Sequence, residues 1–147
     1  MSVMSTLGVK PPGGCHFPAA GYSEFARLMD RMIEHQLYGR FLDAPPTPPN
    51  LKRAFFANDK RDELILEFDY AIVWQDSLTS QFYLDGESKQ IASGSANHTR
   101  ITLKLKSPSE ASKVSYLDSA SWSPDNLLYG QNGLAALTFC DVPISDK

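Results

Sequence analysis

The segment LDAPPTPPN, residues 42–50, constrains the fold of this chain more than any other stretch. Four of its nine residues are proline, which fixes the backbone φ angle and lacks the N–H group that helices and central strands require. The segment can therefore be neither helix nor inner strand, and we expect an extended, semi-rigid linker. It separates residues 1–41 from residues 51–147, and the two parts differ in sequence pattern.

Residues 19–38 have the spacing of an amphipathic helix, because apolar side chains recur three or four positions apart. Pro18 stands where the first helical turn tolerates a missing N–H, and Gly39 is a typical C-terminal stop. One face of this helix is apolar and consists of Tyr22, Phe25, Ala26, Met29, Met32, Ile33 and Leu37.

After the linker the pattern changes to short segments that alternate between apolar and polar residues. In RITLKLK, residues 100–106, the side chains of Ile101, Leu103 and Leu105 fall on one face. The spacing predicts a mainly β fold, namely an antiparallel β-sandwich of about seven short strands preceded by one amphipathic helix. The expected strands are residues 51–57, 63–69, 80–86, 90–96, 100–106, 113–118 and 134–139.

Charge and composition exclude several classes of partner. The net charge is −3, whereas nucleic-acid binding requires a clustered basic excess, so we expect no nucleic-acid partner. No apolar run approaches the roughly 20 residues of a membrane-spanning helix, and the first residues do not form a secretory signal. With two distant cysteines, Cys15 and Cys140, we expect free thiols and a cytoplasmic location by default. A secreted parent chain remains an alternative.

His16 is the candidate for chemistry, because the turn PPGGCHFPAAGY (residues 11–22) holds it directly before the helix. A histidine so placed can act as a general base, given a nucleophile and an orienting carboxylate. The alternative is a helix cap or a bond to a neighbouring carbonyl. No G-x-S-x-G or Gly-Asp-Ser motif supplies a nucleophile. Ser93 and Cys15 are weak candidates, and a small buried thiol is the simpler interpretation of Cys15.

Neither a metal nor a cofactor is expected. His16, His35 and His98 share no ligand spacing, and no carboxylate pattern completes a site. Aromatic residues at strand positions are more often core than ligand-facing. Trp74 and Trp122 lie near turn residues, and they are the better candidates for the rim of a carbohydrate site.

The stretch GGCHFPAAGYSEFARLMDRMI, residues 13–33, resembles the last conserved block of SGNH (GDSL-type) hydrolases. In that family the catalytic histidine precedes the last helix, and His16 matches it, with Gly21, Tyr22 and Ala26 matching the start of the helix. The stretches FYLDG (residues 82–86) and NLLYGQNGLAALTF (residues 126–139) are similar to the C-terminal region of sialate O-acetylesterases and acetylxylan-esterase-like enzymes.

The chain departs from the family pattern D-x-x-H, because the position of the aspartate is Gly13. The family also places its serine and oxyanion-hole blocks far upstream of the histidine, whereas 15 residues precede His16 here. The resemblance therefore implies one member of a catalytic set, with the serine nucleophile outside this sequence.

Two hypotheses follow. In the first, the chain is the C-terminal part of a carbohydrate O-acetylesterase-like SGNH hydrolase, with residues 1–41 as a remnant of the hydrolase domain, residues 42–50 as linker and residues 51–147 as β-sandwich domain. It would be inactive alone, a carbohydrate ester would be the substrate of the complete enzyme, and we expect a homodimer through the uncovered helix. In the second, the chain is a stand-alone β-sandwich module that binds carbohydrate or protein. Packing of the helix on the sandwich would favour the second hypothesis, and an exposed helix face the first.

Overall fold

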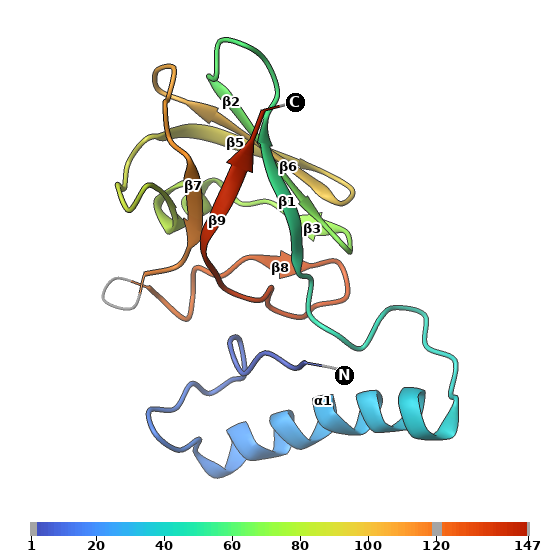
Figure 1. Ribbon diagram of the computed structural model, residues 1–147. Helices are drawn as coiled ribbons and strands as arrows, with labels where there is room; N and C mark the ends of the chain where they lie inside the picture. Colours follow the sequence, from blue (N-terminus) through green and yellow to red (C-terminus); the bar gives the residue numbers. More distant parts are fainter. Residues whose placement is uncertain (1–2, 119–121, 147) are drawn as a thin grey trace.

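The computed structural model describes residues 3–118 and 122–146. The described residues contain one α-helix, α1 (Ala19–Tyr38). It lies beside a β-rich body, which we call the β-body, formed by the strands that follow it in the chain (Figure 1). The remaining elements are β1 (Leu51–Phe56), β2 (Glu63–Phe68), β3 (Ile72–Val73), the 3-10 helix η1 (Asp76–Gln81), β4 (Phe82–Leu84), β5 (Ile91–Asn97), β6 (Arg100–Leu105), β7 (Lys113–Tyr116), β8 (Tyr129–Gly130) and β9 (Phe139–Ser145).

The β-body is one seven-stranded mixed sheet in the order β4-β7-β9-β1-β2-β6-β5, accompanied by the small pair β3-β8. The sheet curls into a nearly closed barrel, and η1 contacts both of its edge strands, β4 and β5. Neighbouring strands of this sheet are antiparallel except β1 and β9, which pair in parallel with Ala54 opposite Ile144. The predicted antiparallel sandwich is therefore wrong, since β9 pairs with both β7 and β1 and so joins the strands of what would be two layers into one seven-stranded sheet.

Alternation along the strands produces the core. In β2 the side chains of Leu64, Leu66 and Phe68 are buried, and in β6 every second residue is buried in the same way. The predicted inward face of residues 100–106 is thus confirmed. Burial of each such side chain stabilises the fold by about 1.5–3 kcal/mol. The bulkiest fully buried side chains are Tyr116, Phe56 and Phe82.

The final predicted strand, residues 134–139, is wrong. Leu134, Ala135 and Ala136 are buried in an irregular segment, and only an isolated bridge joins Ala135 to Tyr129. The last strand, β9, begins where that prediction ended, at Phe139. The sequence pattern did not predict β9, because it contains Asp141, with φ 52°, and Pro143. Strands usually exclude both residue types.

The predicted helix is confirmed over its whole length. Pro18 is its N-cap, with extended backbone, and Gly39 is its C-cap in the left-handed conformation (φ 65°), donating its N–H to the Glu34 carbonyl. Glycine suits this position because it adopts positive φ without steric cost.

The proline segment contains neither helix nor strand, and β1 begins at Leu51, as expected. The backbone of this segment is hydrogen-bonded to the barrel, so the segment does not act as a flexible linker. The Asn132 side-chain amide donates to the carbonyls of Pro45 and Thr47 at 3.0 and 2.9 Å, and the Leu137 N–H donates to the Pro49 carbonyl at 2.9 Å. The division into residues 1–41, 42–50 and 51–147 stays a prediction.

Candidate functional site

His16 lies in the irregular segment that leads into α1, and its side chain is exposed. The segment is fixed by a hydrophobic staple, in which a residue before the N-cap packs on the fourth helical residue. Here Phe17 contacts Tyr22 edge to face, with ring centroids 5.9 Å apart. Phe17 also stacks on Phe25 at 6.4 Å, so the residue that directly follows His16 is anchored to the helix by two ring contacts.

The His16 side chain forms one hydrogen bond within the described part of the chain, to Tyr22. Its Nδ1 lies 3.4 Å from the Tyr22 hydroxyl, and either group can be the donor, depending on the imidazole tautomer. For Nε2 to act as a base, the proton must reside on Nδ1 and be donated to the Tyr22 oxygen. The hydroxyl thus occupies the place next to Nδ1 where a catalytic triad holds a carboxylate.

Backbone geometry explains why position 13 is glycine and not the aspartate of the D-x-x-H pattern. A Cβ atom built on Gly13 would lie 2.3 Å from the carbonyl oxygen of His16 itself. Any side chain at this position would therefore force the turn to open. The turn that places His16 before α1 excludes a carboxylate from the expected position.

The structure brings His16 together with no nucleophile among the described residues. Cys15 is exposed rather than buried, which corrects the expectation of a buried thiol, and Cys140 is exposed as well; both are free thiols. Ser93 lies on the edge strand β5 and is exposed. Of the other histidines, His35 donates from Nδ1 to the Arg40 carbonyl at 3.0 Å. The described residues contain no group of three potential metal ligands.

The apolar surface of α1 divides into two neighbouring faces. One face packs on the N-terminal segment and the barrel, where Leu28 joins Val9 and Leu134 in a small buried cluster, with Phe25 at its edge. The other face is uncovered. Tyr22, Met29, Ile33 and Leu37 are exposed by 48%, 41%, 40% and 76%.

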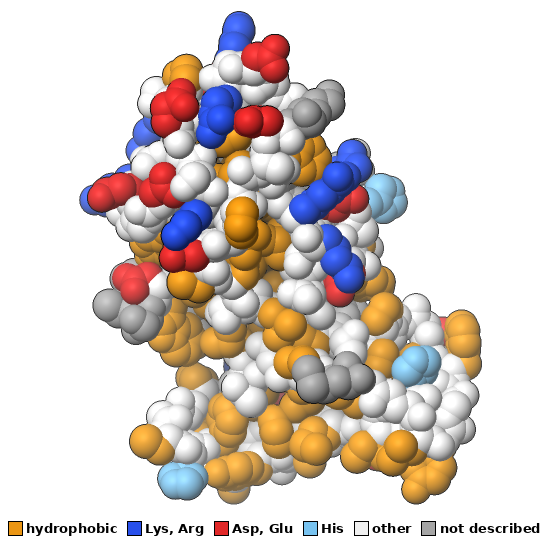
Figure 2. All heavy atoms as spheres, viewed as in Figure 1, with side chains coloured by type: hydrophobic (Ala, Val, Ile, Leu, Met, Phe, Trp, Pro, Cys, Tyr) orange, Lys and Arg blue, Asp and Glu red, His pale blue; other side chains and the backbone are white. Residues whose placement is uncertain are grey.

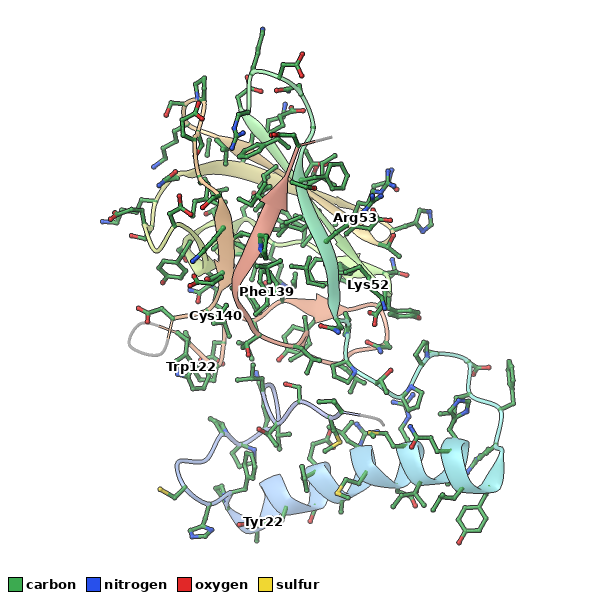
Figure 3. All side chains as sticks on the ribbon, viewed as in Figure 1. Tyr22, Lys52, Arg53, Trp122, Phe139 and Cys140 are labelled. Atoms are coloured by element: carbon green, nitrogen blue, oxygen red, sulfur yellow. The ribbon has the colours of Figure 1, made fainter. Side chains whose placement is uncertain are left out.

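Figure 2 shows hydrophobic side chains predominating over α1, whereas Lys, Arg, Asp and Glu gather over the barrel. Figure 3 shows Tyr22 on the side of α1 that faces away from the barrel. No helix in the described residues is long and apolar enough to cross a membrane. We call Tyr22, Ala26, Met29, Ile33 and Leu37 the outer stripe of α1. Because soluble proteins rarely leave such a stripe in water, it indicates a missing cover.

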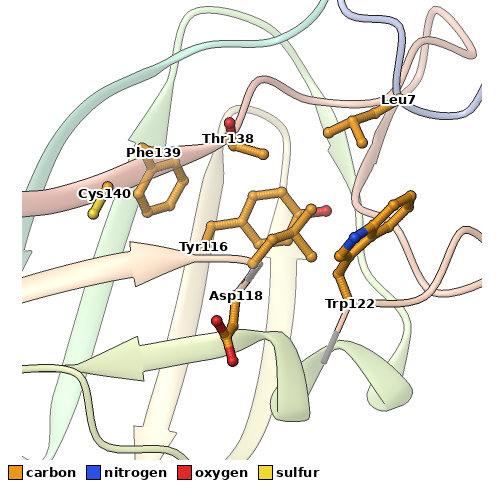
Figure 4. Close-up of a pocket in the computed structure, with 8 residues that line it drawn as sticks. Leu7, Tyr116, Asp118, Trp122, Thr138, Phe139 and Cys140 are labelled. Carbon is orange, nitrogen blue, oxygen red and sulfur yellow. The ribbon is translucent and has the colours of Figure 1, made fainter. Parts of the chain in front are cut away.

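A second candidate site is an open cavity of about 400 Å³ between the N-terminal segment and the barrel. It lies where β7 ends and β9 begins, and Figure 4 shows Trp122 and Leu7 at one end, opposite Phe139 and Cys140. Trp122 is 41% exposed. Trp74, in contrast, packs on the core, stacks on Phe82 and donates from Nε1 to Asp76.

Tyr116 forms the floor of this cavity and is buried. Its hydroxyl accepts a hydrogen bond of 2.6 Å from the Leu128 N–H. Burial raises the pKa of Tyr116 to about 12, because the charged phenolate is poorly solvated there. The floor of the cavity is therefore uncharged, and the Tyr116 hydroxyl is held in place by the Leu128 N–H.

No family model and no curated protein matches the sequence. Among solved structures, the crystal structure of XAC1771, a carbohydrate acetylesterase from Xanthomonas citri, is similar with a TM-score of 0.61 and 19% sequence identity. The chain shares its fold with part of that enzyme. The similarity covers 90% of this chain and 30% of the acetylesterase. It concerns the fold, and it leaves the role of His16 a prediction.

Sequence reasoning located the histidine turn and the helix but missed the contact between His16 and Tyr22. The available signal was the staple pattern, since Phe17 and Tyr22 stand at the positions before and inside the helix that normally pack together. The cavity beside Trp122 was anticipated only as a rim. Its floor comes from strands that are distant in sequence and could not be assembled from local patterns.

Proposed function

We propose that this chain is the C-terminal part of a carbohydrate O-acetylesterase of the SGNH type, in which His16 is the general base. The observation that carries the proposal is the fold shared with an acetylesterase over 90% of this chain. Because that likeness extends over 30% of the acetylesterase, the proposal places the serine and the oxyanion-hole donors in another part of a complete enzyme.

The outer stripe of α1 supports this arrangement. Tyr22, the hydrogen-bond partner of His16, is the first residue of the stripe, so a body that covers the stripe also reaches His16. A nucleophile carried by that body would meet the imidazole at the N-terminal end of α1. The same contact would bury the apolar side chains that are exposed here.

The proposed chemistry assigns one proton shuttle to this chain. His16 Nε2 takes the proton from the serine hydroxyl as its oxygen attacks the acetyl carbonyl. The tetrahedral intermediate collapses, the sugar oxygen leaves, and His16 returns the proton to it. A water molecule then attacks the acetyl-enzyme while His16 takes a proton from it, and His16 returns this proton to the serine oxygen as acetate is released. Tyr22 provides no negative charge beside the imidazolium, in contrast to the carboxylate of a triad.

A chimeric enzyme tests the proposal. Residues 1–147 would replace the structurally matching part of the Xanthomonas citri acetylesterase, and hydrolysis of 4-nitrophenyl acetate would be measured. We expect activity that His16→Ala lowers by about 10³-fold or more, whereas His98→Ala, in the turn between β5 and β6, leaves it unchanged. A folded chimera that is inactive, or that is indifferent to His16→Ala, contradicts the proposal.

The second candidate function is a carbohydrate-binding module without catalysis. The exposed ring of Trp122 at the rim of an open cavity favours it, since aromatic rings are common platforms for ligands. This function requires saturable sugar binding by the isolated chain that is independent of His16.

A further inference from the structure

Packing around the turn places the Tyr22 hydroxyl beside Nδ1 of His16. Gly21 is buried, and a Cβ atom there would lie 3.0 Å from Cβ of Phe17 and 3.0 Å from the carbonyl oxygen of Pro11. The turn therefore lies directly on the start of α1. The Phe17 ring meets the Tyr22 ring edge to face at 5.9 Å, which restricts the rotation of the Tyr22 side chain. His16 thus faces one hydroxyl group, 3.4 Å from its Nδ1.

The hydrogen bond between His16 and Tyr22 can run in two directions, which have opposite chemical consequences. If the Tyr22 hydroxyl donates to Nδ1, the imidazole proton is on Nε2, and neither nitrogen is free to take a proton from a nucleophile. If Nδ1 donates to the Tyr22 oxygen, the lone pair of Nε2 is free for that step. The Tyr22 proton decides between them, because a hydroxyl donates to one acceptor at a time.

When the outer stripe is uncovered, the hydrogen bond is more favourable from Tyr22 to His16. A phenol is a good donor, and an imidazole nitrogen is a stronger base than a phenol oxygen. The Tyr22 hydroxyl forms no other hydrogen bond within the described residues, so no second acceptor in this part of the chain draws its proton away from Nδ1. This direction leaves His16 unable to act as a base.

A body that covers the outer stripe would change this balance. Tyr22 is the first residue of the stripe and is 48% exposed, so the same body would enclose its hydroxyl. A buried hydroxyl requires hydrogen-bond partners, and an acceptor on the covering body, a backbone carbonyl or a carboxylate, would take the Tyr22 proton. The Tyr22 oxygen would then accept from Nδ1–H. No proton is gained or lost overall, because the imidazole releases the Nε2 proton to water and takes one up at Nδ1.

We infer that Tyr22 is a positioning residue whose hydroxyl sets the tautomer of His16. The imidazole proton is on Nε2 while the outer stripe is uncovered, and on Nδ1 when an acceptor on a covering body takes the Tyr22 proton. The use of Nε2 as a base rests on the proposed function, whereas the tautomer of the uncovered chain does not. Tyr22 thus makes His16 basic only where the covering body is in place.

The three histidines of the chain provide internal standards for ¹⁵N NMR of the isolated chain. At about pH 9 an ordinary imidazole is neutral, and the ¹⁵N shifts distinguish its protonated nitrogen from the other. His35 marks the Nδ1–H tautomer, because its Nδ1 donates to the Arg40 carbonyl at 3.0 Å. His98 is exposed and marks the mixture of tautomers found in water. His16 should show a larger Nε2–H fraction than His98.

Tyr22→Phe removes the hydroxyl and keeps the ring that packs on Phe17, so the His16 shifts should move to those of His98. Tyr38→Phe is the matched control, since Tyr38 is 80% exposed, and it should leave the His16 shifts unchanged. His16 shifts that match those of His35 in the isolated chain would overturn the inference. Shifts that Tyr22→Phe does not change would overturn it as well.

The chimeric enzyme tests the covered state. There the His16 shifts should match the Nδ1–H pattern of His35, and Tyr22→Phe should lower kcat by about tenfold, as expected for one lost hydrogen bond, with KM unchanged. An active chimera in which Tyr22→Phe changes neither kcat nor the His16 shifts would overturn the inference and leave the esterase proposal standing. An inactive chimera would reject the esterase proposal, while the tautomer measured in the isolated chain would stand.

Discussion

Gly94 lies directly beneath the indole ring of Trp74, so closely that a Cβ atom on Gly94 would be 2.1 Å from Cζ2 of that ring. The ring cannot simply turn away, because it stacks on Phe82 with 6.1 Å between centroids and is held through Nε1 by Asp76. Trp74 can therefore pack at the edge of the core because Gly94, on β5, has no side chain.

Gly94→Ala is therefore expected to destabilise the fold by about 1–3 kcal/mol, the usual cost of overpacking. Urea denaturation followed by circular dichroism measures this difference. Gly14→Ala is the matched control, because a Cβ at Gly14 meets no atom within 4 Å. Equal stability of the two variants would show that Trp74 moves freely.

Alkaline pH should destabilise the barrel through Tyr116. Burial raises the pKa of Tyr116 to about 12 in the folded protein, against about 10 for a tyrosine in the unfolded chain. Between these values the unfolded chain has released the phenolic proton while the folded chain retains it, so the free energy of unfolding falls as pH rises. The stabilising difference is complete below pH 10 and is lost through pH 12, a total of about 2–3 kcal/mol.

Tyr116→Phe should flatten this dependence of stability on pH between 10 and 12. At neutral pH the same variant should lose about 1–3 kcal/mol, because the Leu128 N–H is left without its acceptor. Tyr38→Phe is the control, since Tyr38 is 80% exposed. An alkaline slope that persists unchanged in Tyr116→Phe would assign it to another group.

Local signals carried part of the fold. The helix was predictable from Ala19 to Tyr38 because the apolar spacing agrees with Pro18 before it and Gly39 after it. The strands β2 and β6 were predictable because their apolar residues alternate strictly. The single curled sheet was not, since it depends on β9 pairing with β1, where Ala54 lies opposite Ile144, 90 residues away, and local periodicity says nothing about such partners.

The candidate site shows the same division. The proline- and glycine-rich turn before the helix made His16 identifiable from the sequence. The predicted apolar face of the helix, however, is only partly buried. Phe25 packs inward while Tyr22, Met29 and Ile33 stay exposed, and this division depends on where Leu134 of the barrel meets Leu28. Which apolar residues of an amphipathic helix are covered is decided by its neighbours and not by its own sequence.

The isolated chain is expected to hydrolyse activated acetyl esters no faster than free imidazole at equal concentration. The hydrogen bond of His16 in the described residues goes to the Tyr22 hydroxyl and not to a serine or thiol nucleophile, and a nucleophile with its oxyanion donors supplies most of the stabilisation of the transition state. Release of 4-nitrophenol from 4-nitrophenyl acetate measures the rate. Saturable turnover that His16→Ala abolishes would reveal a nucleophile within this chain.

Self-association through α1 is the final expectation. Met29, Ile33 and Leu37 are exposed by 41%, 40% and 76%, and full burial of each large apolar side chain is worth about 1.5–3 kcal/mol. The inner face of the helix already contacts the barrel through Leu28, so the outer stripe needs a different cover. When the chain is alone in solution, a second copy can provide this cover, most simply in a two-fold dimer. Sedimentation velocity over a wide concentration range should show reversible association that Met29→Glu abolishes.

Ser23→Glu introduces the same charge on the polar face of the helix and should leave the association unchanged. If the chain stays monomeric at all concentrations and Met29→Glu does not change its sedimentation, the outer stripe is stable when exposed to water. That result would remove one support of the proposed function.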